Sequence, residues 1–189
     1  MSGARLQILH FDTNITLVLD IVIWLFFHLR IGHVVAGIPL SHFNPEARFY
    51  QSAPFEQDGQ IYQKLFRVRS WKHLVPSLGS MVEDAYDLKR LSDLSVENLR
   101  TWIAESCRSE FCHWMLILPG FLFFLWNPPE VGWLMVLYAV LNNSIPIILQ
   151  RYNRPRVRKL LKAVERQKSR ERKADLAYEG QTALSNSDQ

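Results

Sequence analysis

The stretch FCHWMLILPGFLFFLW, residues 111–126, is separated by the four residues NPPE from VGWLMVLYAVLNNSIPIIL, residues 131–149. Each run approaches the roughly 20 apolar residues that a helix needs to cross about 30 Å of hydrocarbon. The short link predicts a tight antiparallel helical hairpin, and Pro119-Gly120 predicts a kink or break in its first arm. Trp126 and Trp133 bracket the turn, as in an aromatic belt at a membrane interface.

A third apolar block precedes the hairpin, from about Ile15 to Leu40. No polar face recurs in it at helical spacing, so we expect it to lie in a membrane rather than in a soluble core. Asp12, Thr13 and Asn14 are candidate N-caps. Asp20 inside the block is expected to be protonated or to face the bundle interior. No cleavable signal peptide is evident, so we expect the block to remain in the mature protein.

The charges lie between these blocks and predict an orientation. Nine Lys and Arg residues fall between positions 41 and 110, eleven between 150 and 189, and none in the hairpin turn. The positive-inside rule therefore places the middle segment and the C-terminus in the cytoplasm, with the N-terminus and the turn outside. The net charge of +4 comes with no nucleic-acid-binding motif, so we expect no nucleic-acid partner. We predict a multi-pass protein of the cytoplasmic (inner) membrane.

The fold class expected is an all-α membrane protein with about three transmembrane helices and interfacial amphipathic helices. Its 189 residues divide into an N-terminal segment with the first span (1–40), a cytoplasmic interfacial segment (41–110), the transmembrane hairpin (111–150) and a basic cytoplasmic helix with a disordered tail (151–189).

Two helix starts are visible in the polar segments. Ser95 is the expected N-cap of a helix with Leu99, Trp102 and Ile103 on one face, and this helix should continue into the second span. The basic helix is expected to start at Pro155. Beyond about residue 174 the sequence has no apolar face, which predicts disorder.

A candidate catalytic pair lies where this interfacial helix enters the second span. Glu110 and His113 have i, i+3 spacing, which places the carboxylate and the imidazole on one helical face. A carboxylate that orients a histidine enables it to act as a general base toward a hydroxyl. The alternative is a polar pair that merely closes the helix at the interface. The ExxH motif occurs once, so a di-iron site is not expected, and neither is another metal or a cofactor. Cys107 and Cys112 are expected to be free thiols.

Two basic runs are candidates for substrate binding. The run QRYNRPR, residues 150–156, offers Arg151, Asn153 and Arg154 as phosphate ligands. The alternative is a simple stop-transfer anchor, although the interleaved Tyr, Asn and Pro are more than an anchor needs. Trp71 and Lys72, with Arg90 further along, form a second cationic and aromatic group. Most such Trp-Lys pairs are snorkelling anchors, which is the alternative here.

These residues together resemble a known family. The matching features are Trp71-Lys72, the run from Tyr86 to Arg90, the cluster of Glu105, Arg108, Glu110 and His113-Trp114 with Pro119, and Pro146 followed by QRYNRPR. They are similar to those of the glycosyl-4,4'-diaponeurosporenoate acyltransferases of the staphyloxanthin pathway. The resemblance extends from about Gly37 to Lys162, whereas the N-terminus and the charged tail are longer than in the carotenoid members.

The resemblance implies transfer of a fatty acyl group to a sugar hydroxyl of a glycolipid such as a glycosylated carotenoid. We expect acyl-CoA or another acyl thioester as the donor, His113 as the base, and Arg108, Lys72 or Asn153 as possible oxyanion donors. Two alternatives stay open: a non-catalytic membrane subunit that binds a partner protein or anionic lipid, and a lipid hydrolase. The sequence leaves the oligomeric state undetermined.

Overall fold

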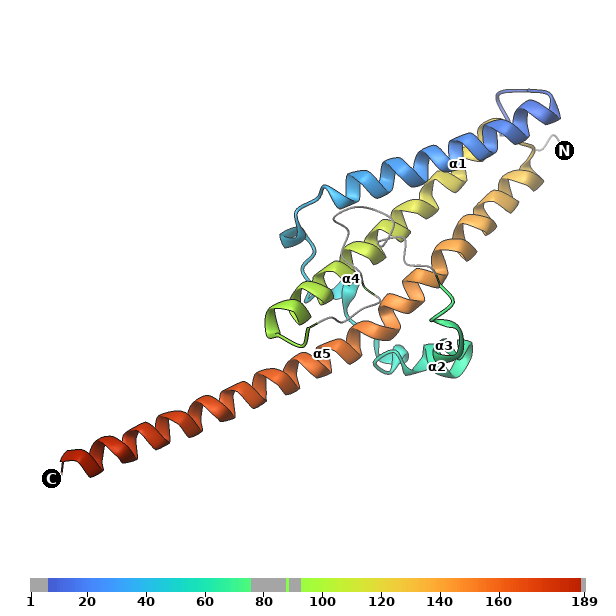
Figure 1. Ribbon diagram of the computed structural model, residues 1–189. Helices are drawn as coiled ribbons and strands as arrows, with labels where there is room; N and C mark the ends of the chain where they lie inside the picture. Colours follow the sequence, from blue (N-terminus) through green and yellow to red (C-terminus); the bar gives the residue numbers. More distant parts are fainter. Residues whose placement is uncertain (1–6, 76–87, 89–92, 188–189) are drawn as a thin grey trace.

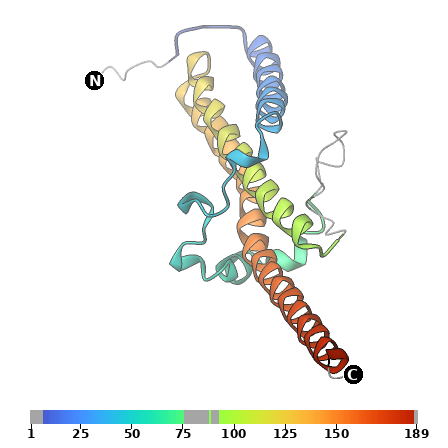
Figure 2. The same ribbon diagram turned by 90° about the vertical axis from the view of Figure 1, so that its left-hand side faces the viewer.

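The computed structural model describes residues 7–75, 88 and 93–187, and every regular element in this part of the chain is helical. Three long segments form the frame (Figures 1 and 2): α1 Thr13–Ala36, α4 Val96–Ile117 and α5 Pro129–Ser187. Short elements connect α1 to α4: η1 Leu40–His42, η2 Arg48–Tyr50, η3 Pro54–Glu56, α2 Gln60–Phe66 and α3 Val68–Trp71. In both views α1 and α4 run beside the first half of α5, and the second half of α5 extends beyond the other elements.

Helix α1 exposes its apolar side chains instead of burying them. Its 24 residues begin after Asp12, which occupies the N-cap position without a side-chain hydrogen bond. Leu17, Ile21, Leu25 and Leu29 recur every fourth residue and are between 59% and 64% exposed. Such a stripe is unfavourable in water and suits a lipid environment. In the described chain, α1 and α5 are long and apolar enough to cross a membrane, consistent with an all-α membrane protein.

The hairpin predicted at residues 111–149 is present, but its first arm changes helix type. Helix α4 starts as predicted, with the Ser95 hydroxyl accepting the backbone N–H of Asn98, and ends at Ile117. The eight-residue 3₁₀ helix η5, Leu118–Leu125, follows because Pro119 lacks an N–H for an α-helical bond. A Cβ on Gly120 would lie 3.2 Å from that of Ala139, so glycine permits the close approach of η5 to α5. The predicted second span, residues 111–126, is divided between α4 and η5, so three spanning helices are not confirmed.

A buried polar group joins α1 to the hairpin turn. Asp20 is buried, and its Oδ1 accepts hydrogen bonds from Trp126 Nε1 at 2.7 Å and Asn127 Nδ2 at 2.9 Å. Asp20 therefore faces the bundle interior, as one of the sequence alternatives stated. The interpretation of Trp126 as a membrane-belt residue is wrong, because its indole is buried on Asp20. Trp133, 62% exposed, remains on the surface.

Helix α5 is continuous over 59 residues, which differs from the sequence prediction at two places. Pro146 and Pro155 both lie inside it, so the basic helix does not start at Pro155. The expected disordered tail continues as helix through Ser187. Extending an existing helix avoids the cost of nucleation, and the tail is rich in Arg, Lys, Glu and Ala, which have high helix propensity.

Candidate functional site

The centre of the candidate site is an ion cluster between α4 and α5. Glu110 is fully buried on α4, and its Oε1 accepts a 2.7 Å hydrogen bond from Arg151 Nε. Its Oε2 lies 2.7 Å from Arg154 Nη2 but accepts no hydrogen bond, so this second contact is electrostatic. Arg154, 2% exposed, donates instead to Ser106 Oγ and to the Ser106 backbone carbonyl. The QRYNRPR run and the ExxHW run of the sequence thus meet in one cluster.

A second carboxylate, Glu56, enters this cluster from the segment between α1 and α4. Arg151 Nη1 donates to Glu56 Oε1 at 2.6 Å, so one guanidinium bridges two buried carboxylates. Tyr62 Oη also donates to Glu56 Oε1, at 2.8 Å, and Oε2 accepts the Ala53 backbone N–H at 3.1 Å. Burial and the adjacent Glu56 carboxylate raise the pKa of Tyr62, which keeps the phenol protonated as a donor.

Glu56 and Ser106 were not identified from the sequence. The available signal was Pro54 followed by Glu56, the pattern of a helix N-terminus whose third residue turns back to cap it. That pattern predicts the bond to Ala53, which the structure contains. The bond to Arg151 spans 95 residues of chain and has no local signature.

The η3–α2 loop packs directly on α5. Gly59 has a φ of +80°, and a Cβ there would lie 2.9 Å from the carbonyl oxygen of Arg151. Only glycine allows both this left-handed backbone and this close approach. The loop thereby holds Glu56 over Arg151.

The predicted hydrogen bond between Glu110 and His113 is corrected. Glu110 turns to the two arginines of α5, whereas His113 Nδ1 lies 2.9 Å from Oδ1 of Asn143 on α5. Asn143 Nδ2 donates to the Ala139 carbonyl at 2.9 Å, which fixes the amide with its oxygen toward the imidazole. The oxygen can only accept, so the proton of neutral His113 resides on Nδ1 and the lone pair on Nε2. Nothing in the described residues bonds that Nε2 atom.

The remaining predicted site residues are spread over the molecule. Arg108 faces α1, with hydrogen bonds to the Ala36 carbonyl at 3.2 Å and Glu105 at 2.6 Å. Trp71 Nε1 donates to the Phe66 carbonyl at 2.6 Å, and Lys72 Nζ lies 5.9 Å from the Tyr152 ring centroid.

Asn153 is half-buried on α5 between the two cluster arginines. Arg90 lies outside the described residues. The structure therefore brings Arg151 and Arg154 together with Glu110, but separates Arg108 from them. Among residues 7–75, 88 and 93–187, no three His, Cys, Asp or Glu side chains form a metal-binding group.

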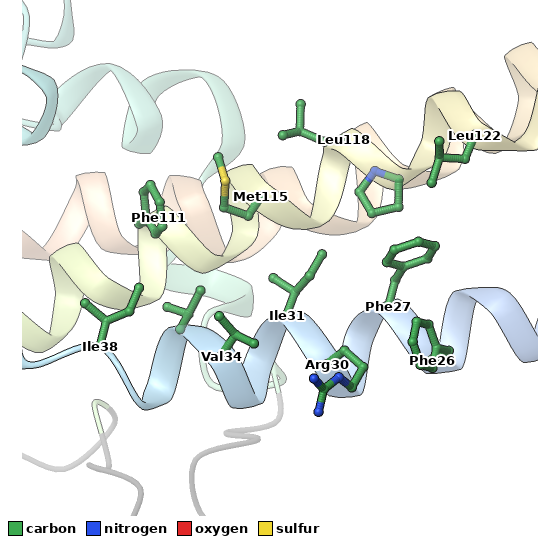
Figure 3. Close-up of a pocket in the computed structure, with 12 residues that line it drawn as sticks. Phe26, Phe27, Arg30, Ile31, Val34, Ile38, Phe111, Met115, Leu118 and Leu122 are labelled. Carbon is green, nitrogen blue, oxygen red and sulfur yellow. The ribbon is translucent and has the colours of Figure 1, made fainter.

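An apolar groove of about 620 Å³ lies between α1 and α4–η5. Figure 3 shows Phe27 and Ile31 of α1 pointing toward the α4–η5 arm and Leu122 pointing from that arm toward α1, while the guanidinium of Arg30 points away from α4. Phe111 lines one end of the groove, one residue from Glu110 in the chain. The groove can accommodate a long hydrocarbon chain, and its lining extends along α4–η5 from Phe111 to Leu122, toward the hairpin turn.

Comparison with known sequences identifies a family. A sequence profile described as glycosyl-4,4'-diaponeurosporenoate acyltransferase matches residues 46–163, which contain Glu56, Glu110, His113 and both cluster arginines. The glycosyl-4,4'-diaponeurosporenoate acyltransferases of Staphylococcus aureus strains MRSA252 and USA300 are each 33% identical over 147 residues, covering 78% of this chain and 88% of theirs. No solved structure matches. The chain belongs to the glycosyl-4,4'-diaponeurosporenoate acyltransferase family, a family of acyltransferases.

Proposed function

We propose that this protein transfers a fatty acyl group from an acyl thioester to a sugar hydroxyl of a glycosylated carotenoid or a related glycolipid. The family membership supports acyl transfer, and the names of the Staphylococcus aureus relatives specify a glycosylated carotenoid acid. The observation that carries the mechanism is the contact of His113 Nδ1 with Asn143 Oδ1 at 2.9 Å, from which the tautomer follows. Its Nε2 lone pair is free, while Asn143 holds the opposite ring nitrogen.

In the proposed reaction, His113 Nε2 removes the proton from the sugar hydroxyl as its oxygen attacks the thioester carbonyl carbon. The tetrahedral intermediate then expels the thiolate, the C–S bond breaks, and the proton passes from His113 to the departing sulfur. The products are an ester and a free thiol. Asn143 stabilises the transient imidazolium by accepting its Nδ1–H, the role that a carboxylate or amide has in other histidine bases.

Glu110 has a different part in this proposal from the one expected from the sequence. Its charge is neutralised by Arg151 and Arg154, so it fixes α5 against α4. Because Asn143 lies two helical turns before Arg151 on α5, this cluster sets the height of Asn143 opposite His113. Glu110 is thus a positioning residue.

The apolar groove between α1 and α4 supports a substrate with a long hydrocarbon chain. We place α1, the α4–η5 arm and the apolar part of α5 in the inner membrane, with the N-terminus outside and the basic end of α5 in the cytoplasm. The ion cluster then lies at the cytoplasmic interface, where an amphiphilic acceptor and a soluble thioester can meet.

The test is a turnover assay with purified protein in nanodiscs, an acyl-CoA and a glycosylated carotenoid, with the ester product measured by mass spectrometry. We expect activity in the parent and in the His33→Gln control, which alters an exposed histidine on α1, and no activity in His113→Ala. Unchanged turnover in a folded His113→Ala protein would exclude the base. Release of free fatty acid without ester would identify a hydrolase, and no turnover in the parent would favour a non-catalytic subunit.

A further inference from the structure

A second cavity, of about 260 Å³, adjoins the ion cluster where α5 passes the segment between η2 and η3. Gln51 and Ser52 line it from that segment, and Arg158 and Lys162 line it from one face of α5. Arg154 borders both this cavity and the Glu110 cluster. The cavity is therefore next to the candidate site. Its lining is basic, whereas the lining of the groove between α1 and α4–η5 is apolar.

Positive charge is in excess in this cavity. Four cations line it, namely Arg154, Arg158, Lys159 and Lys162, against one carboxylate, Asp58. Lys159 pairs with Asp58 at 2.9 Å, and Arg154 is neutralised by Glu110. Arg158 and Lys162 supply the charge that remains.

These two cations are incompletely satisfied by the protein. Arg158 Nη2 donates to the Pro45 carbonyl, but its nearest carboxylate, on the exposed Glu46, is 3.6 Å away. Its Nε is buried and has no hydrogen-bond partner. Lys162 has no ion-pair partner in the described part of the chain. A buried guanidinium N–H without an acceptor is unfavourable unless a ligand supplies one.

The relative placement of the two cations fits an anion. Arg158 and Lys162 are four residues apart on α5, so their side chains project from the same helical face. Ser52 and Gln51 line the cavity from the other side; the Ser52 hydroxyl can donate, and the Gln51 amide, which donates one N–H to the Glu46 carbonyl at 2.8 Å, has a second N–H. Guanidinium, ammonium and hydroxyl donors around one cavity are the usual ligands of a phosphate group.

We propose that this cavity binds a phosphate group of the acyl donor, with Arg158 and Lys162 as its principal cations. The assignment of the phosphate to a donor rests on the proposed acyl transfer. It also replaces the sequence expectation that Arg151 and Arg154 bind phosphate. Those guanidiniums are engaged by Glu110, Glu56, Ser106 and backbone carbonyls, so a phosphate there would have to displace buried carboxylates. The phosphate can belong to coenzyme A or to a phospholipid that supplies the acyl chain.

The test measures binding, not turnover, with the full-length protein in detergent. We compare Arg158→Gln/Lys162→Gln with Lys168→Gln/Arg172→Gln, which also removes one Lys and one Arg four residues apart on α5, at exposed positions away from the cavity. Calorimetry measures the affinity for coenzyme A, the first phosphate source. Native mass spectrometry measures how much phosphatidylglycerol, the second source, stays bound to the protein. We expect the cavity variant to weaken one of them about tenfold or more, and the control to change neither by more than about twofold.

Lys162→Glu changes an exposed side chain, and we expect it to weaken phosphate binding even if the double variant folds poorly. Equal affinities in the cavity and control variants for both ligands would overturn the proposal. His113→Ala should bind both phosphate ligands as the parent does. If the parent binds phosphate but shows no acyl transfer, the proposed function is rejected and the phosphate site is retained.

Discussion

Arg151 Nε donates a 2.7 Å hydrogen bond to Glu110 Oε1 and thereby connects two motifs that are 41 residues apart in the chain. With Glu56 and Arg154, these residues form a cluster of two carboxylates and two guanidiniums, largely removed from solvent. Burial alone lowers the pKa of Arg151, but the two carboxylates outweigh it and raise the pKa. The charges balance within the cluster, so removal of any one leaves an uncompensated charge in a buried site.

Glu110→Gln is therefore expected to destabilise the fold strongly. Breaking a buried ion pair from one side costs about 3–5 kcal/mol, because the partner charge stays buried. The measurement is the free energy of unfolding in detergent, followed by circular dichroism. Arg100→Gln is the control on the same helix, since its pair with Glu165 is solvent-exposed and should contribute no more than about 1 kcal/mol. Equal losses in the two variants would contradict the role assigned to the cluster.

Gly59→Ala tests the packing of the η3–α2 loop on α5. The added Cβ would meet backbone atoms of Arg151 and Tyr152 at 2.9–3.2 Å, at a φ that L-residues rarely adopt. The loop must move away and weaken the Glu56–Arg151 bond, so we expect a loss of about 1–3 kcal/mol and a lower kcat. Gly32→Ala is the control, because a Cβ there meets nothing within 4 Å. Equal stability and activity of the two variants would show that the loop is not fixed by this contact.

Asn143→Ala tests whether the amide orients His113. Loss of the Nδ1–H acceptor should lower kcat by roughly tenfold or more with little change in KM, because substrate contacts are retained. Asn143→Asp keeps an acceptor at this place and should restore much of the activity. Asn142→Ala, at the neighbouring exposed position, is expected to behave like the parent. A rise in KM without a fall in kcat would instead indicate that Asn143 contacts the substrate.

Cys107 should behave as an unreactive core thiol. It packs with Val35 and Phe43, and burial raises its pKa to about 11. The native thiol therefore stays protonated at pH 8, and in a Cys112→Ser background its alkylation should be many times slower than in denaturant. Between the usual thiol pKa and about pH 11, the unfolded thiol loses its proton and the native thiol does not. Stability should fall as pH rises through that window. Equal labelling rates in native and denatured protein would contradict this burial.

Much of the fold follows from local sequence signals. Ser95 as the N-cap of α4, the hairpin turn near Asn127 and the interruption at Pro119-Gly120 were predicted, because capping, turn and proline effects act within a few residues. Helix α5 beyond Pro155 was not predicted. In a sequence, a proline predicts the start or the interruption of a helix. Here α5 packs on α4 before it reaches Pro155, and it continues as a helix beyond that residue.

The sequence predicted several residues of the candidate site, but it did not predict their hydrogen-bond and ion-pair partners. Spacing on α4 places Glu110 and His113 on one face, but it does not determine which charge each side chain meets across the bundle. Glu110 is drawn to two arginines because a buried carboxylate gains more from opposite charges than from an imidazole. His113 then pairs with Asn143, a residue that no sequence motif identified.

Residue order alone determined that apolar helices would alternate with basic segments, that α4 would start after Ser95 and that its arm would be interrupted at Pro119-Gly120. Hydrophobic period, capping and proline effects are properties of neighbouring residues. Only the tertiary structure decided that Glu56 closes the Glu110–Arg151–Arg154 cluster and that the Nε–H of Arg158 lacks an acceptor. Those facts depend on how helices turn about their axes when they pack, and rotation is set by the sum of many contacts across the bundle.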